Sequence, residues 1–190
     1  MPRTSTREKI LRSAETLFAR DGVDRVTLRQ IGREASQRNV AAVQYHFGGK
    51  DDLLSEILDR HLAAIDARRA QMLETADDGD LEALLDVLVL PLVEKLDDAS
   101  GRAYLRIQAQ QPSSGAGMRP ATRRMSARIR RALDAPNADP LRDRFAVLLL
   151  FNALADRTRR EEEGEASPRS RRRFASSLSR AIRGIYRGGD

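Results

Sequence analysis

The sequence has no cysteine, few aromatic residues and no long hydrophobic run. Without cysteine, disulfide frameworks, thiolate zinc sites and cysteine nucleophiles are excluded, and a cytoplasmic location is the default expectation. The longest apolar run, residues 145–151, is far shorter than the ~20 residues that a membrane-spanning helix needs. The first 18 residues also lack the uninterrupted apolar segment of a signal peptide. We therefore expect a protein that is neither secreted nor membrane-spanning.

The alternating β-branched segments that are typical of strands are missing as well. Nearly every segment instead has apolar residues at helical spacing, which predicts an all-α fold. Residues 5–8 and 27–30 each have the pattern of a helix-starting capping box, and Gly22 ends the first helix. Asn39 is a candidate N-cap for a third short helix that ends at residues 48–49.

A fourth helix is expected from Lys50 to about residue 76, with two acidic residues in its first turn where the helix dipole favours negative charge. Asp139-Pro140 and Ser167-Pro168 each have the pattern of an N-cap followed by proline at the first helical position. Beyond the fourth helix, the expected helices are 80–97, 100–111, 117–133, 140–160 and 168–187.

Positive charge is unevenly distributed along the chain. The net charge of +6 divides into +5 for residues 1–50, −10 for residues 51–100 and +11 for residues 101–190. Because the C-terminal part is the most basic, charge alone does not locate a nucleic-acid site. The arginines at 169 and 171–173 begin the last helix, where positive charge is unfavourable, so we expect them to pair with the glutamates of 161–165.

The second and third short helices have the spacing of a helix-turn-helix, in which the second helix enters the major groove of DNA. In this unit Val40, Val43 and Phe47 are expected to face inward. The opposite face combines small residues with side chains that can reach bases or phosphates, namely Ala41, Ala42, Gln44, Tyr45 and His46.

The segment IGREASQRNVAAVQYHFGGKDDLL resembles the TetR family of bacterial transcription regulators. In that family the recognition helix ends in Tyr-His-Phe or a similar triplet, followed two residues later by lysine and then by a helix starting with acidic residues and leucine. The upstream segment ILRSAETLFARDGVDRVTLRQIG is similar to the family's first helix, glycine turn and threonine-led second helix. The resemblance covers residues 7–58, and beyond residue 60 only the helical layout is similar.

The resemblance implies a DNA-binding domain in residues 1–50 and a helical regulatory and dimerisation domain in residues 51–190. It further implies a homodimer, joined by the last two long helices, that binds a palindromic operator, acts as a repressor and is released by a small molecule. The alternative is an architectural or accessory DNA-binding protein without a ligand. No catalytic pattern accompanies the two histidines, so we expect no enzyme activity, no metal and no cofactor.

Roles at the DNA follow from the same resemblance. Thr27 is expected near phosphate, Arg29 near the groove and Lys50 on phosphate, whereas Gln44 either reads adenine or touches phosphate. The turn before the third helix is one residue longer than the family's usual Ala-Gly-Val-Ser, which leaves the register of that helix open by about one residue. The residues expected to contact DNA are Thr27, Arg29, Arg38, Asn39, Val40, Ala41, Gln44, Tyr45, His46 and Lys50.

Two further expectations concern the C-terminal domain. The candidates to line an effector pocket are Leu62, Ile65, Leu88, Leu92, Tyr104 and Leu105, with plain core as the alternative. His61 is expected to be partly exposed or at the edge of a pocket. Residues 145–155 are apolar around the whole helix, which favours burial against both the chain's own core and a partner subunit.

Overall fold

The first helix begins and ends where its capping residues predict. In the computed structural model, which describes residues 5–36, 40–111, 118–133 and 139–187, α1 spans Thr6–Asp21. The Ser5 hydroxyl accepts from the N–H of Glu8 at 3.2 Å, and Gly22, with φ +94°, donates to the carbonyl of Phe18 at 3.1 Å. The Glu8 carboxylate, however, accepts from arginines on α1 and α4, so the predicted return bond of the capping box is replaced by ion pairs.

The next two helices are short and joined by a tight turn. A complete capping box of Thr27 and Gln30 starts α2 (Leu28–Glu34). Ser36, in the turn after it, has φ +56°, a left-handed conformation that non-glycine residues seldom adopt. α3 spans Val40–Phe47 and ends at Gly48, which has φ +77°. The predicted N-cap Asn39 lies outside the described residues.

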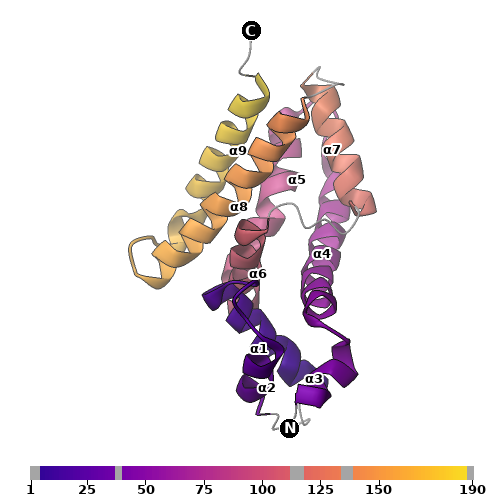
Figure 1. Cartoon of the computed structure of the whole chain (residues 1–190). Helices are drawn as coiled ribbons and strands as arrows, with labels where there is room; N and C mark the ends of the chain where they lie inside the picture. The colour runs from indigo at the N-terminus through magenta and orange to yellow at the C-terminus, as the bar shows by residue number, and fades with distance from the viewer. Residues whose placement is uncertain (1–4, 37–39, 112–117, 134–138, 188–190) are drawn as a thin grey trace.

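One long helix joins the N-terminal helices to the rest of the chain. α4 spans Lys50–Thr75, packs against α1 and α3 near its start, and also packs against α5 and α7. Figure 1 shows α1 to α3 gathered at one end of the molecule and α4 leading from them toward the opposite end, where the C-terminus lies. The boundary expected at residue 50 therefore coincides with the start of a continuous helix.

The remaining helices form the C-terminal body. Their bounds are α5 (Leu81–Val93), α6 (Ala99–Gln110), α7 (Pro120–Ala132), α8 (Pro140–Glu162) and α9 (Arg171–Arg187), with 3₁₀ turns η1 (Glu94–Asp97) and η2 (Pro168–Ser170). α6 lies between α1 and α8, and α9 packs against α5 and α8 (Figure 1). None of the helices in the described ranges combines the length and the apolar character needed to cross a membrane.

Three predicted helices differ at one end from their expected bounds, and α7 is one of them, since it starts at Pro120 rather than at residue 117. The helix expected to reach residue 97 is α-helical only to Val93, and Pro91, in its last turn, has no N–H to donate to the carbonyl four residues earlier. At the last helix, the Ser167 hydroxyl caps the 3₁₀ turn η2, and α9 starts at Arg171 rather than at Pro168. The Asp139-Pro140 start of α8 is confirmed, since the Asp139 carboxylate accepts from the N–H of Leu141 at 2.9 Å.

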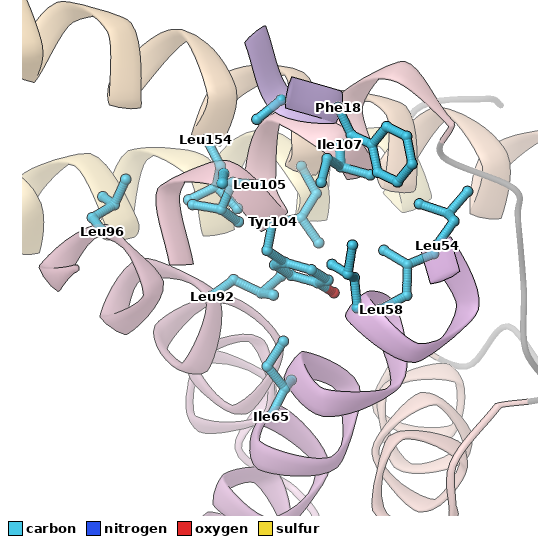
Figure 2. Close-up of a cluster of buried hydrophobic side chains, with 14 of the residues drawn as sticks. Phe18, Leu54, Leu58, Ile65, Leu92, Leu96, Tyr104, Leu105, Ile107 and Leu154 are labelled. Atoms are coloured by element: carbon cyan, nitrogen blue, oxygen red, sulfur yellow. The ribbon is translucent and has the colours of Figure 1, made fainter. Parts of the chain in front are cut away.

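The hydrophobic core is centred on α6. Tyr104, Leu105 and Ile107 are fully buried there, and Figure 2 shows them among side chains of α1, α4, α5 and α8. Gly101 near the start of α6 permits a close approach to η1, because a Cβ atom at this position would lie 2.1 Å from the Lys95 carbonyl oxygen. The core thus depends on a contact that only glycine allows.

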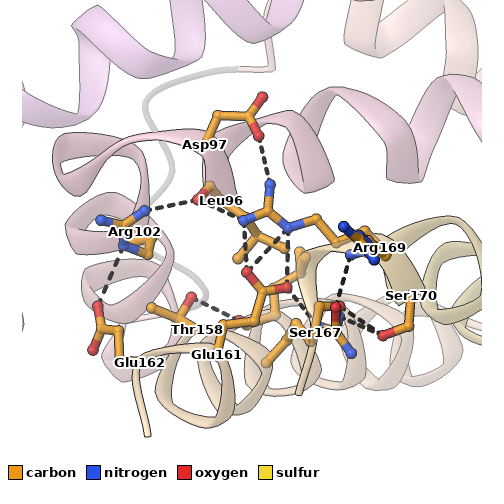
Figure 3. Close-up of polar contacts among 12 residues, drawn as sticks. Leu96, Asp97, Arg102, Thr158, Glu161, Glu162, Ser167, Arg169 and Ser170 are labelled. Carbon is orange, nitrogen blue, oxygen red and sulfur yellow. Dashed lines mark hydrogen bonds and ion pairs between the residues drawn. The ribbon is translucent and has the colours of Figure 1, made fainter. Parts of the chain in front are cut away.

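A polar network fastens α8 to α9 and η1 (Figure 3). The Glu161 carboxylate accepts from Arg157 at 2.7 Å and from Arg171 at 2.6 Å, and Arg171 also contacts Asp97 at 2.5 Å. Burial alone would raise the pKa of Glu161, but the two guanidinium groups outweigh it and hold the pKa below its ordinary value. The expected pairing of the arginine cluster with nearby glutamates is therefore confirmed for Arg171.

Candidate nucleic-acid interface

At the centre of α3, the side chains on the outer face are exposed to solvent. Gln44 is exposed, and Tyr45 is 87% exposed, the most of the large apolar or aromatic side chains among the described residues. His46 is half-buried, with its ring 5.4 Å from the ring of Tyr45. Val43 and Phe47 are buried, as predicted, so α3 presents one face to the core and the other to solvent.

The start of α2, the helix that packs against α3, is also at the surface. Thr27 and Arg29 are both exposed. The Thr27 hydroxyl accepts from the N–H of Gln30 at 3.3 Å and donates to its side-chain oxygen at 2.8 Å. Thr27 therefore stabilises the start of α2 from a position at the surface.

Lys50 contacts main-chain atoms of the turn between α1 and α2. Its ammonium group donates to the carbonyl of Val23 at 3.0 Å and to that of Asp24 at 3.4 Å. These bonds connect the first residue of α4 to the N-terminal helices. An ammonium group has three N–H donors, so these two contacts leave a further donor for another acceptor.

Four of the predicted DNA contacts have no described side chain. Arg38 and Asn39 lie outside the described residues. Val40 and Ala41 are in the first turn of α3, where the backbone is described and the side chains are not. The other six residues lie on the three-helix unit or at its junction with α4, namely Thr27, Arg29, Gln44, Tyr45, His46 and Lys50.

The arrangement of these helices matches a known family of DNA-binding proteins. Residues 10–57, which cover most of α1, all of α2 and α3 and the beginning of α4, match the family model of bacterial regulatory proteins, tetR family. The N-terminal helices of the chain are therefore similar to the part of the TetR family that this model describes. No protein among those with curated descriptions matches the chain.

Solved structures of TetR-type regulators have the same fold over nearly the whole chain. SmeT, the repressor of the Stenotrophomonas maltophilia multidrug efflux pump SmeDEF, is 26% identical, with a TM-score of 0.61, and the match covers 98% of this chain and 96% of SmeT. A SmeT–triclosan complex is 24% identical over 98% of this chain and 97% of that chain, with a TM-score of 0.55. A TetR-like regulator from Rhodococcus sp. RHA1 is 16% identical, with 97% and 99% coverage and a TM-score of 0.58.

The candidate effector-pocket residues do not line one common cavity among those found in the described residues. Ile65, Leu92, Tyr104 and Leu105 are fully buried in the core, and Leu62 packs against it. Leu88 alone lines a described cavity, of about 130 Å³, together with side chains of α7, α8 and α9. The apolar walls of that cavity include Met125, Ile129, Ala146 and Leu150.

A larger cavity of about 520 Å³ lies where the DNA-binding helices meet the C-terminal body. We call it the junction cavity. It is lined from α1 by Glu8, Leu11, Arg12, Glu15 and Thr16, from α4 by Ile57, Arg60 and His61, and from the start of α6 by Asp98, Ala99, Ser100 and Ala103. Periodicity does not predict this cavity, because its three walls come from segments distant in sequence.

A buried polar cluster forms part of the junction cavity. His61 Nε2 lies 2.7 Å from Glu15 Oε1, and the Ser100 hydroxyl donates to Glu15 Oε2 at 2.7 Å. The imidazole stacks on the phenol ring of Tyr104 at a centroid distance of 4.6 Å. His61 is only 9% exposed. Of the two positions expected for His61, partly exposed or at the edge of a pocket, the structure shows the second.

Arg69 is a second buried polar group that the sequence did not indicate. Its guanidinium donates to the Leu88 carbonyl at 3.1 Å and to the Thr122 hydroxyl at 3.0 Å, so it joins α4 to α5 and α7. No carboxylate of the described residues forms an ion pair with it, and its Nε atom has no hydrogen-bond partner among them. Burial lowers the pKa of Arg69 to about 10, against the opposing effects of Tyr104 and Asp66.

Proposed function

We propose that the chain is a ligand-responsive repressor of the TetR family that binds a palindromic operator as a homodimer. The observation that carries the proposal is the exposed face of α3 within the family-matched residues 10–57. In a helix-turn-helix, the second helix enters the major groove and presents its outer side chains to base edges. In this chain that second helix is α3.

The contacts at the operator divide into two kinds. Gln44, exposed at the centre of α3, is suited to bidentate hydrogen bonds with adenine. Lys50, Thr27 and Tyr45 are suited to the phosphate backbone, where they set the register without reading sequence. Arg29, Arg38, Asn39, Val40, Ala41 and His46 complete the proposed contact set. The third N–H donor of Lys50 supports its role, because the two carbonyl bonds hold the ammonium group at the turn between α1 and α2 and leave that donor for a phosphate.

The proposed homodimer is joined by α8 and α9. Leu141 is 55% exposed and Phe145 is 54% exposed on α8, while Ala146, Leu150 and Leu154 on the same helix are buried. A helix with an apolar face left in solvent is suited to a second helix pair across a two-fold axis. A symmetric dimer also provides two copies of α3 for two half-sites of a palindrome.

The proposed effector is a small molecule bound within the C-terminal body. The cavity of about 130 Å³ beside Leu88 supports this proposal, since it lies between α5, α7, α8 and α9 and has mainly apolar walls. The SmeT–triclosan complex is an example of a chain of similar fold solved with a small aromatic molecule. The described cavities favour this function over an architectural DNA-binding protein, which needs no ligand site.

Selection of DNA from a random pool tests the function directly. The full chain is incubated with random duplexes, and the bound fragments are sequenced after several rounds. We expect a palindrome whose half-site centres lie about one helical turn apart or slightly more. An enriched but asymmetric motif would argue against the two-fold dimer, and the absence of any enriched motif would remove the regulator interpretation.

A further inference from the structure

Residues 23–26, which we call the α1–α2 turn, are held in place by side chains from two other helices. Lys50, at the start of α4, donates to the carbonyls of Val23 and Asp24 at 3.0 and 3.4 Å. Gln110, at the end of α6, accepts from the N–H of Val23 at 3.3 Å. The main chain of the turn is therefore fixed before any partner binds to it.

Arg25 is the cation that this turn exposes. Val23 and Val26 are buried, at 4% and 1% exposure, whereas Asp24 and Arg25 between them are exposed. The guanidinium of Arg25 forms no ion pair or hydrogen bond with any residue that the structure describes. Because the main chain on either side is already fixed, binding of a partner by Arg25 has to order little more than its own side chain.

The arginines of the three-helix unit fall into two groups. Those on α1 each form an ion pair with a carboxylate, namely Arg7 with Glu56, Arg12 with Glu8 and Arg20 with Asp21. The described ones from the α1–α2 turn onward are exposed and form no ion pair within the described ranges, namely Arg25, Arg29 and Arg33. Guanidinium groups that the protein itself leaves unneutralised are available to an anionic partner.

Arg25 lies between two residues that are proposed to bind phosphate. In the sequence it precedes Thr27, the N-cap of α2, by two residues. In space, the Lys50 ammonium is bonded to the carbonyl of Asp24, the residue directly before Arg25. Lys50 itself follows the end of α3 by three residues. A DNA strand that contacts both Thr27 and Lys50 therefore passes the turn that carries Arg25.

We propose that the α1–α2 turn is a further binding site for the DNA backbone, in which Arg25 binds phosphate beside Lys50. Guanidinium groups form paired hydrogen bonds with phosphate, and such contacts set the register of the protein on the duplex without reading its sequence. The carboxylate of Asp24 opposes this binding, because it carries the same sign of charge as the phosphate. The inference rests on the proposed function, since it adds a contact to the same complex with DNA.

The salt dependence of duplex binding tests Arg25 without knowledge of the operator. The full chain is titrated into a fluorescent duplex of random sequence at several NaCl concentrations between about 50 and 200 mM, the range in which phosphate contacts dominate the change in affinity. The loss of one phosphate contact lowers the slope of log K against log salt by about 0.9 in magnitude. Arg25→Gln should therefore lower it by about 0.9 for each bound copy, or about 1.8 for a homodimer. Arg25→Lys keeps the charge and should retain the wild-type slope.

Two further variants separate a local contact from the general effect of charge. Arg124→Gln is the matched control, because Arg124 is exposed on α7 and has no ion-pair partner in the described part of the chain. It removes the same charge away from the three-helix unit and should leave the slope unchanged. Asp24→Asn removes the opposing charge and should tighten binding about twofold. An unchanged slope for Arg25→Gln, or an equal fall for Arg124→Gln, would overturn the proposal.

The outcomes distinguish this inference from the proposed function. A palindrome selected from random DNA, together with an unchanged slope for Arg25→Gln, would refute the phosphate site alone. A reduced slope for Arg25→Gln without any selected motif would uphold the site and refute the operator-binding regulator. A wild-type chain that binds no duplex in this salt range would refute both. Far-UV circular dichroism of each variant confirms that a changed slope is not a loss of fold.

Discussion

Replacement of Gly101 by alanine offers a sharp test of the packing between η1 and α6. The added Cβ would lie 2.1 Å from the Lys95 carbonyl oxygen and 2.9 Å from its carbonyl carbon and Cα, whereas ordinary van der Waals contact begins at 3.4 Å. All three atoms are backbone, so no side chain can rotate away. The start of α6 would have to move by about 1 Å, against the close packing of a protein interior.

The expected magnitude follows from two opposing effects. In a helix, alanine is more favourable than glycine by about 1 kcal/mol. Overpacking in a rigid core costs about 1–3 kcal/mol and occasionally more, and a clash with backbone belongs to the upper part of that range. We therefore expect Gly101→Ala to lower the free energy of unfolding by about 2 kcal/mol.

Equilibrium unfolding in urea, followed by circular dichroism at 222 nm, measures this change. Gly79→Ala is the control, because a Cβ there meets only the Asp77 carboxylate at an ordinary 3.7 Å. That substitution should leave stability unchanged or raise it by about 0.4–1 kcal/mol, because alanine lowers the conformational entropy of the unfolded chain. A Gly101→Ala protein as stable as the wild type would refute the argument for a glycine-specific contact.

Other parts of the molecule give further testable predictions. Because the folded pKa of Glu161 is lowered, its contribution to stability is present above its unfolded pKa and is lost as pH falls through its folded pKa. Glu161→Gln should therefore make the free energy of unfolding decline less steeply below about pH 5 in an acid titration. Arg69→Met removes a buried charge that has no carboxylate partner in the described chain, and thermal unfolding should show equal or higher stability, by up to about 2 kcal/mol; a clear loss would mean that its two hydrogen bonds dominate. Phe145→Glu should shift the chain toward monomer in analytical ultracentrifugation, and an unchanged dimer would exclude this face of α8 from the interface. Lys50→Ala should weaken binding to all duplexes and flatten its salt dependence, whereas Gln44→Ala should relax base preference at one position; equal effects of both on specific and random DNA would refute the division of roles.

The sequence predicts this fold well where local chemistry determines the structure. The Thr27–Gln30 capping box, the glycine at position 22 and the Asp139-Pro140 pair each mark a helix end within a few residues. Such signals act between residues one to four positions apart, so they can be found without knowledge of the fold. The helix-turn-helix was predictable for the same reason, because its spacing and capping residues are contiguous in the chain.

The junction cavity was not predictable, because its groups meet only after folding. Glu15 and His61 are separated by 46 residues, and Glu15 and Ser100 by 85. A histidine at that position of an amphipathic helix gives no indication of its partner on another helix. The burial of Arg69 was not predictable either, because an arginine is expected at the surface and its partners, on α5 and α7, are distant in sequence.

The length of α4 has a geometric consequence for the proposed repressor. Its 26 residues form a rod of roughly 39 Å at a rise of about 1.5 Å per residue. If the rod pivots at its C-terminal end, a tilt of about 5° displaces the other end by about 3 Å, close to the spacing of about 3.4 Å between stacked base pairs. If two protomers tilt in opposite directions, the distance between their DNA-binding ends changes by twice that displacement. A stiff arm of this kind can therefore turn a change smaller than one side chain into a mismatch with the DNA repeat.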